Sequence, residues 1–122
     1  MWSPSWDFDD ATFDRTAESF DNPDFIEVVI YSYRHRFGLV AGDNSFADIE
    51  ARLSEQPPIT VPTITVDGEV DGVVLPTDGS GFAHRFTSGF QHMRIPNVGH
   101  NLPQESPEAF ADAILSLHHS VA

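Results

Sequence analysis

The chain divides at Pro57-Pro58 into two parts whose apolar residues follow different periods. Before this pair, apolar side chains recur at helical spacings, whereas after it β-branched runs alternate with loops and short helical segments. Two consecutive prolines cannot continue a helix. Strands that alternate with helices are typical of βαβ units and a parallel sheet. The sequence therefore predicts an α/β fold, with a helical segment followed by two parallel strands and helices.

In the first part, caps and glycine predict where three helices begin and end. Asp9 or Asp10 caps the first helix, Asn22-Pro23 begins the second, and Gly38 ends it. The expected helical ranges are residues 9–20, 22–38 and 45–55. Aromatic side chains near the N-terminus are expected in a core: Trp2, Trp6, Phe8, Phe13 and Phe20.

In the second part, two strands are predicted at residues 59–66 and 90–95. The first is rich in β-branched residues, and its Pro62 suits the start of a strand better than the centre. A short helix is expected at residues 82–86. Ser106-Pro107 opens the last helix, because serine caps and proline suits the first helical position.

Charge and composition limit the partners of this chain. Nineteen acidic residues oppose six arginines, which gives a formal net charge of −13. Such a chain repels phosphate backbones and anionic lipids, so neither nucleic acid nor a membrane is expected as a partner. The absence of cysteine excludes disulfides, Cys-ligated zinc and a thiol nucleophile. Without a long apolar run or a signal-peptide pattern, a cytoplasmic location is expected.

An acid and a histidine follow the two predicted strands. Asp71 closes the run Val61-Pro-Thr-Ile-Thr-Val-Asp-Gly-Glu-Val-Asp71, and His100 stands in Gly99-His100-Asn101. Loops that leave parallel strands meet at the edge of the sheet where ligands bind. There a carboxylate can orient an imidazole whose other nitrogen takes a proton from a nucleophile or water. Asp71 and His100 are therefore candidate catalytic residues, although the spacing alone leaves it equally open that each is an ordinary loop residue.

Two segments resemble a known family: Pro62-Thr-Ile-Thr-Val-Asp-Gly68-Glu-Val-Asp71-Gly-Val-Val and Pro96-Asn-Val-Gly99-His100-Asn-Leu-Pro103-Gln-Glu-Ser-Pro107-Glu-Ala-Phe110. They are similar to the C-terminal part of an α/β-hydrolase of the epoxide hydrolase, dehalogenase and esterase branch. In that family the triad acid lies in a Gly-x-x-Asp turn, and the triad histidine lies in a Gly-His turn before a helix. The resemblance implies that Asp71 is the acid and His100 the base.

The first part of the chain is similar to the helical cap of the same family, on Asn22-Pro-Asp-Phe25 and Ser32-Tyr-Arg-His-Arg36. The resemblance implies a cap segment at residues 1–57 and the C-terminal part of the hydrolase core at 58–122. It also implies a small, uncharged ester, epoxide or carbon–halogen substrate and no cofactor. Tyr33 and His35 are candidate substrate-binding residues. The alternative is that Tyr33 packs in a core and His35 belongs to a solvated helix end.

No nucleophile turn accompanies the pair. The family carries its nucleophile in a Gly-x-nucleophile-x-Gly turn, and none of Ser80, Ser88 and Asp78 has a glycine two residues away on each side. The resemblance implies that this turn and the oxyanion loop precede the cap. We therefore expect a truncated hydrolase that is inactive alone and associates with itself or with an N-terminal hydrolase half. The alternative is a non-catalytic interaction or assembly module derived from a hydrolase.

Metal binding is not expected. The run from Asp67 to Asp78 imitates the ligand spacing of a calcium-binding EF-hand loop, but that loop needs a helix on both sides, and a strand is predicted before it. His118 and His119 are adjacent on a predicted helix and therefore point in different directions.

Overall fold

The computed structural model describes residues 1–120, which form two compact units. One unit, Asp7–Gln56, contains only helices. The other unit contains the sheet and joins Met1–Trp6 to the chain from Pro57 onward. The division thus falls beside Pro57, where the period of the sequence changes. The sequence pattern grouped residues 1–6 with the helices, but in the structure they are hydrogen-bonded to loops of the sheet unit.

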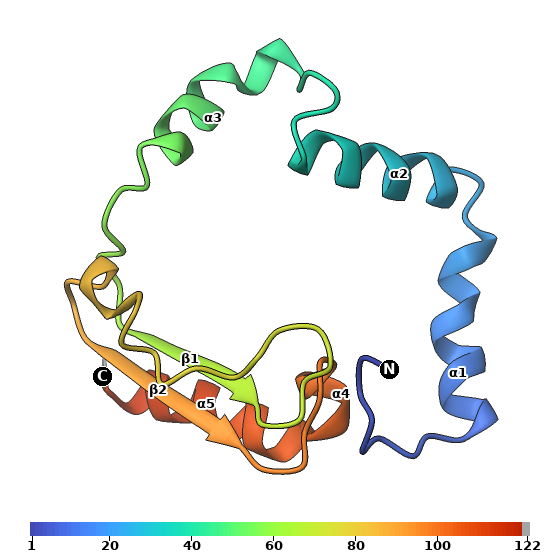
Figure 1. The fold of residues 1–122 in the computed structure, drawn as a ribbon, viewed down its shortest axis with the longest axis vertical. Helices are drawn as coiled ribbons and strands as arrows, with labels where there is room; N and C mark the ends of the chain where they lie inside the picture. Colours follow the sequence, from blue (N-terminus) through green and yellow to red (C-terminus); the bar gives the residue numbers. More distant parts are fainter. Residues whose placement is uncertain (121–122) are drawn as a thin grey trace. The chain divides into compact units, whose positions relative to one another are not determined.

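The helical unit begins with α1 (Asp10–Ala17), whose N-cap is Asp9. The Asp9 carboxylate accepts a hydrogen bond from the backbone N–H of Thr12 at 2.8 Å, which satisfies a donor that has no partner within the helix. The unit continues with η1 (Glu18–Asp21), α2 (Phe25–Arg36), η2 (Asn44–Phe46) and α3 (Ala47–Ser54) (Figure 1). The three predicted helices are therefore present. Of the helices in residues 1–120, none is long and apolar enough to cross a membrane.

The second helix begins later than the sequence predicts. The Asn22 side chain accepts a hydrogen bond from the backbone N–H of Asp24 at 3.0 Å, and α2 starts only at Phe25. Asn22 therefore stabilises a local turn, which is the competing use of such a side chain. The predicted end is correct, because Gly38 has a φ of 68°, a left-handed conformation that glycine adopts without strain.

The sheet unit contains two parallel strands, β1 (Thr63–Gly68) and β2 (Phe90–Ile95). Their arrows point the same way in Figure 1, and the pairing runs in register from the first to the last residue of both strands. The position of β2 confirms the predicted range. β1 begins later than predicted because Pro62 has no N–H for the ladder, and Ile59 pairs only as an isolated bridge with Phe86.

Three helical segments accompany the strands. Between β1 and β2 in the chain lies η3 (Ala83–Arg85), a single 3₁₀ turn in place of the predicted short helix. After β2 come α4 (Leu102–Glu105), which the sequence did not predict, and α5 (Pro107–Ser120), which begins at the predicted proline.

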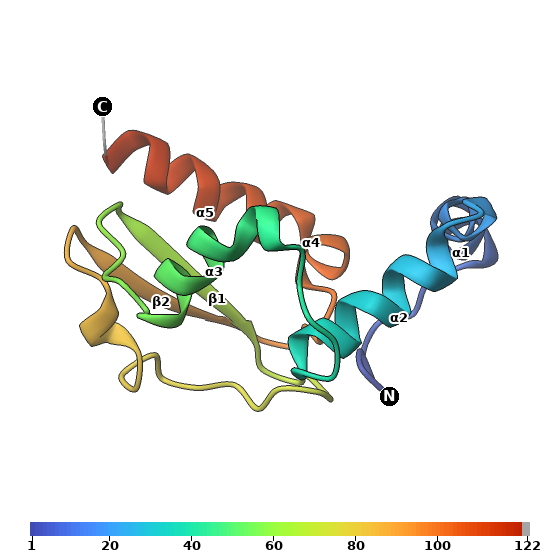
Figure 2. The ribbon, with the colours of Figure 1, turned by 90° about the horizontal axis from the view of Figure 1, so that it is seen from above.

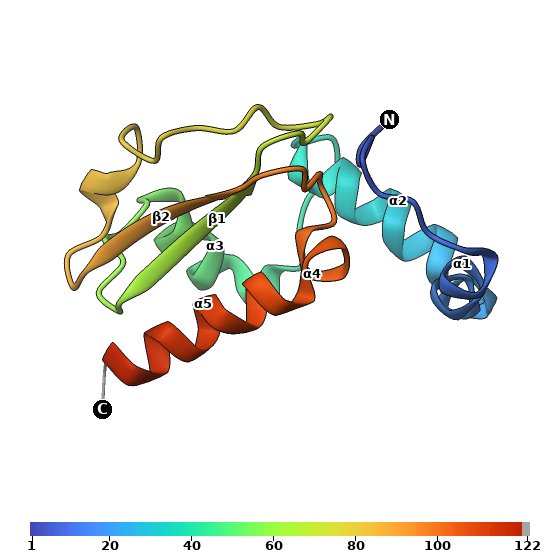
Figure 3. The same cartoon turned by 90° about the horizontal axis from the view of Figure 1, so that it is seen from below.

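Helix α5 covers one face of the sheet, and the loop that follows β1 runs along the other (Figures 2 and 3). Within residues 1–120 only three apolar residues are buried: Val98, Leu102 and Ala113. Ile114 and Leu115 on α5 are both 52% exposed. The sheet unit therefore encloses a small core and leaves much apolar surface uncovered.

The aromatic residues near the N-terminus do not form the expected core. Trp2, Phe13 and Phe20 are all more than half exposed. None of α1, α2 and α3 contains a buried residue. For Phe13 and Phe20 the expectation was wrong because, within the helical unit, no second layer packs against the apolar faces of the helices.

We expect Gly68→Ala to push apart the two loops that leave the sheet. A Cβ atom at Gly68 would overlap the carbonyl oxygens of Val98 and Gly99, which are backbone atoms and cannot swing away. Overpacking of this kind typically costs about 1–3 kcal/mol of the free energy of unfolding, measured by urea denaturation. Gly81→Ala is the control, because a Cβ there meets open space and should change this free energy by less than about 0.5 kcal/mol. Equal losses in both variants would contradict the close approach at Gly68.

Candidate active site

Asp71 and His100 lie together at the edge of the sheet where both strands end. Asp71 is in the loop that follows β1, and His100 is in the loop that follows β2. Nδ1 of His100 is 2.9 Å from Oδ2 of Asp71. The structure therefore brings together the acid and the histidine that the sequence singled out.

The Asp71 carboxylate is held by three donors. Oδ2 accepts from His100, and Oδ1 accepts from the backbone N–H groups of Val73 at 2.7 Å and Val74 at 3.1 Å. Burial raises the pKa of Asp71, whose side chain is 14% exposed, but the hydrogen bonds from His100, Val73 and Val74 outweigh it and hold the pKa below its ordinary value. Asp71 is therefore a fixed anion near neutral pH.

The contact with Asp71 determines which nitrogen of His100 is available for chemistry. Because a carboxylate only accepts hydrogen bonds, we assign the proton of neutral His100 to Nδ1. Nε2 is then an acceptor, and no hydrogen bond links it to another group within residues 1–120. The side chain is 33% exposed, so Nε2 can receive a proton from a bound molecule. This is the arrangement of a general base oriented by an acid.

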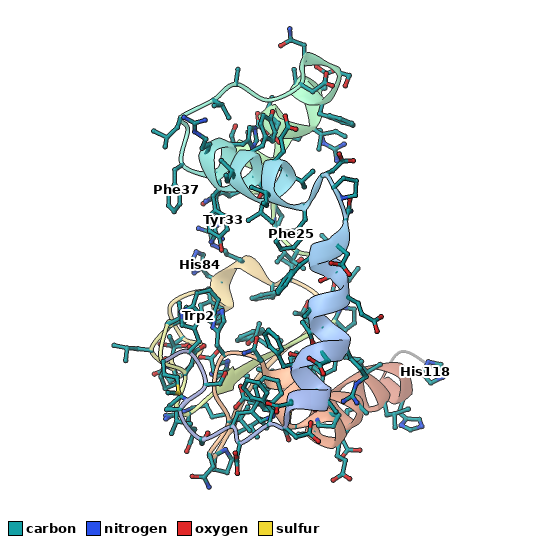
Figure 4. The ribbon with its side chains drawn as sticks, turned by 90° about the vertical axis from the view of Figure 1, so that its right-hand side faces the viewer. Trp2, Phe25, Tyr33, Phe37, His84 and His118 are labelled. Carbon is teal, nitrogen blue, oxygen red and sulfur yellow. The ribbon has the colours of Figure 1, made fainter. Side chains whose placement is uncertain are left out.

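Trp2 connects the two loops. Its carbonyl oxygen accepts from the backbone N–H of Gly72, next to Asp71, at 3.0 Å and from the N–H of His100 at 3.2 Å. Its ring meets the imidazole edge to face, with ring centroids 5.3 Å apart (Trp2 is labelled in Figure 4). The sequence did not predict that Trp2 joins the two loops. Every residue carries a backbone carbonyl, so a contact between this group and distant residues leaves no pattern in the sequence.

Ser3 contacts the same turn from the N-terminal segment. The residue is 8% exposed, and its Oγ accepts from the backbone N–H of His100 at 3.2 Å and from the side-chain amide of Asn101 at 3.0 Å. It thus contacts the backbone of His100 and not the imidazole. Ser80, which was weighed as a nucleophile from the sequence, donates a hydrogen bond to Asp78 at 2.6 Å. Neither serine is placed as a nucleophile by these contacts.

The two candidate substrate-binding residues, Tyr33 and His35, belong to the helical unit, on α2. Tyr33 is 51% exposed and stacks on Phe37, the residue that follows α2; both are labelled in Figure 4. His35 stacks on Tyr31 and lines an open hollow of about 230 Å³ together with Asp43 and Glu50, among others. Neither residue lies in a packed core, so both side chains are accessible from the surface of their unit.

The metal-binding alternatives gain no support from the described residues. Within residues 1–120, no group of three or more His, Asp or Glu side chains is placed to hold a metal ion. The carboxylates of the calcium-like run accept hydrogen bonds instead: Asp67 from Thr77, Asp71 from His100 and Asp78 from Ser80. The run follows a strand, and an EF-hand loop would follow a helix.

Comparison with known proteins supplies one match. No protein-family model and no curated protein matches this chain. Among solved structures, it is similar to a crystal structure from Klebsiella pneumoniae subsp. pneumoniae that is described as a "putative epoxide hydrolase". The TM-score is 0.89 and the sequence identity is 45%, over 94% of this chain and 38% of that chain.

This chain is similar to part of an epoxide hydrolase-like protein. The match confirms the α/β fold class that the alternation of strands and helices predicted. It also spans only 38% of the length of that protein. The activity of the whole Klebsiella protein is therefore treated below as a proposal for this chain.

The lowered pKa of Asp71 predicts a pH dependence of stability. Asp71 is ionised more readily in the folded chain, so it contributes stability above its ordinary pKa of 3.8, and this contribution is lost as the pH falls through the lower folded pKa. The carboxyl ¹³C shift of Asp71, followed against pH, should give a midpoint below 3.8. In His100→Ala the midpoint should rise but stay lowered, because Val73 and Val74 still donate. A parent midpoint at or above 3.8 would contradict the assignment.

Proposed function

We propose that this chain supplies the acid and the base of an α/β-hydrolase catalytic triad. Asp71 is the acid and His100 is the base. The observation that carries the proposal is the 2.9 Å contact between Nδ1 of His100 and Oδ2 of Asp71 at the carboxyl ends of two parallel strands. The similarity to a protein described as a "putative epoxide hydrolase" supports the same reaction class.

In this reaction Asp71 holds the Nδ1–H of His100 and stabilises the imidazolium that forms. Nε2 takes the proton from a water molecule, which attacks the covalent ester that an earlier step leaves on the nucleophile. With a serine nucleophile that intermediate is an acyl-enzyme formed from an ester substrate. With an aspartate nucleophile it is an alkyl-enzyme formed from an epoxide or a carbon–halogen substrate. As the tetrahedral intermediate collapses, the His100 imidazolium gives this proton to the departing oxygen, so that both the nucleophile and neutral His100 are restored.

Among the three substrate classes, an epoxide is the first to test. The description of the similar Klebsiella protein favours it. A small uncharged substrate also suits the electrostatics, because a chain with a net charge of −13 repels anions. The product of this reaction is a vicinal diol, formed by addition of one water molecule across the opened ring.

The helical unit is proposed as the cap segment of the hydrolase. On α2, the exposed Tyr33 and the half-buried His35 are then the proposed substrate-binding residues. A tyrosine hydroxyl or an imidazole N–H can donate a hydrogen bond to the oxygen of an ester or epoxide. The part of the sheet unit from Pro57 onward is then the corresponding part of the hydrolase core.

The nucleophile is proposed to come from polypeptide that covers the open sheet. Two strands leave an unpaired edge on both sides, and apolar residues such as Ile114 and Leu115 on α5 are half exposed. A further part of a hydrolase sheet would cover this surface and supply both the nucleophile and the oxyanion donors. The alternative is that the same surface binds a second copy of the chain in a non-catalytic assembly.

We expect the 122-residue chain to hydrolyse a chromogenic ester or a styrene-type epoxide only at a slow, general-base rate. His100→Ala should lower this residual rate by roughly 10²-fold, the lower end of what a positioned general base contributes. His118→Ala is the matched control, because His118 is exposed in the last turn of α5 (Figure 4), and its loss should leave the rate unchanged. Equal rates for the parent and His100→Ala would refute the pair as a base. Turnover at about 1–10³ s⁻¹ would mean that the chain contains a nucleophile.

The exposed apolar surface predicts self-association of the isolated chain. Sedimentation velocity at increasing protein concentration should show species larger than the 13.5 kDa monomer. Leu115→Glu should weaken this association, because it places a charge on the exposed apolar surface of α5. Ser116→Glu, at an exposed neighbouring position, adds the same charge and is the control. A monomer at all concentrations, with cooperative unfolding, would show that the chain needs no partner.

A further inference from the structure

Glu105 binds the backbone on both sides of His100. Oε2 of its carboxylate accepts from the N–H of Gly99 at 2.7 Å, and Oε1 accepts from the N–H of Asn101 at 2.9 Å. Both bonds are partly buried, and both involve a charged acceptor if the carboxylate is ionised. Such bonds are shorter and roughly twice as strong as neutral ones. One side chain thus fixes the two peptide units that flank the proposed base.

Helix capping explains only one of these two contacts. Asn101 is the N-cap residue of α4, and a glutamate that reaches back to an N-cap N–H is a known way of stabilising a helix start. Gly99 lies outside the helix, before the N-cap, so its N–H is not one of the donors that a helix leaves unpaired. The bond from Gly99 therefore stabilises the turn that contains His100.

The N–H of His100 itself is held by the N-terminal segment. It donates to Oγ of Ser3 and to the carbonyl oxygen of Trp2, both at 3.2 Å. Three consecutive N–H groups, from Gly99 to Asn101, are thus bound by groups on either side of the turn. The fit is tight, since a Cβ on Gly99 would lie 2.6 Å from Cα of Ser3. The turn has little freedom to rotate the imidazole away from Asp71.

Glu105 does not act on the imidazole directly. Within residues 1–120 the only ion pair that His100 makes is with Asp71. Any influence of Glu105 on the base must therefore pass through the position of the backbone.

We propose that Glu105 is a positioning residue for the Asp71–His100 pair, because its carboxylate fixes the turn that presents Nδ1 of His100 to Asp71. The inference rests on the proposed function, in which that contact prepares His100 as the base. It adds a third residue and a second carboxylate to the site, one that touches neither substrate nor reacting atoms.

The test compares Glu105→Ala and Glu105→Gln with Glu108→Ala and Glu108→Gln in the full chain. Glu108 is an exposed glutamate in the first turn of α5, so the control variants make the same chemical changes nearby. Urea denaturation curves first establish a temperature at which every variant is folded in the absence of urea. Three quantities are then measured at that temperature. They are the pH midpoint of the Asp71 carboxyl ¹³C shift, the tautomer of His100 from its ring ¹⁵N shifts, and the free energy of unfolding.

Glu105→Ala removes both acceptors, so we expect the Asp71 midpoint to rise toward its ordinary value and His100 to lose its preference for Nδ1–H. Glu105→Gln keeps one acceptor but turns an NH₂ group toward the other N–H, so its changes should be intermediate. If Glu105→Ala fails to fold, the same readouts on Glu105→Gln decide the question. The Glu108 variants should change neither the midpoint nor the tautomer.

The outcomes separate this inference from the proposed function. If the Glu105 variants lose stability while the Asp71 midpoint and the His100 tautomer stay at their parent values, Glu105 only caps α4 and the inference is wrong. If the parent itself shows no Nδ1–H preference and an Asp71 midpoint at 3.8, the pair does not exist in solution, and the proposed function fails instead.

Discussion

Parallel pairing of β1 with β2 determines where everything in the proposed site lies. The last residues of the strands, Gly68 and Ile95, are paired. The loops that follow β1 and β2 therefore leave the sheet at the same end and in the same direction. Backbone bonds continue this contact beyond the strands, from Glu69 to Ile95 and from Val70 to Val98. In an antiparallel pair the two loops would leave at opposite ends of the strands, and Asp71 and His100 could not meet.

The close approach of these loops depends on residues with little or no side chain. Gly68 passes directly over the carbonyl groups of the loop after β2, and Gly99 packs against Ser3. The N-terminal segment then closes the arrangement, because the Trp2 carbonyl accepts from both loops. The chain thus begins beside the site, leaves to form the helical unit and returns at Pro57 to form the sheet.

Polar contacts, more than apolar burial, hold the site in place. Few apolar residues are buried, whereas the Asp71–His100 pair and the turn around it are fixed by a connected set of hydrogen bonds. Within residues 1–120, no buried side-chain nitrogen or oxygen lacks a partner. A network in which every member is satisfied favours one geometry, because any displacement leaves a buried group unpaired. This explains how a small core can keep a defined acid–base contact.

The sequence by itself determined the features that depend on local chemistry. The Asp9 cap, the end of α2 at Gly38, the range of β2 and the start of α5 at Pro107 all follow from neighbouring residues, and the strand-exit motif pointed to Asp71 and His100. Only the tertiary structure decided that Asn22 forms a turn and that Trp2, Phe13 and Phe20 are exposed. It also decided that Ser3, Trp2 and Glu105 bind the backbone of the turn at residues 99–101, which contains His100. These features depend on which segments pack together, and on backbone groups that every residue carries, so no spacing in the sequence encodes them.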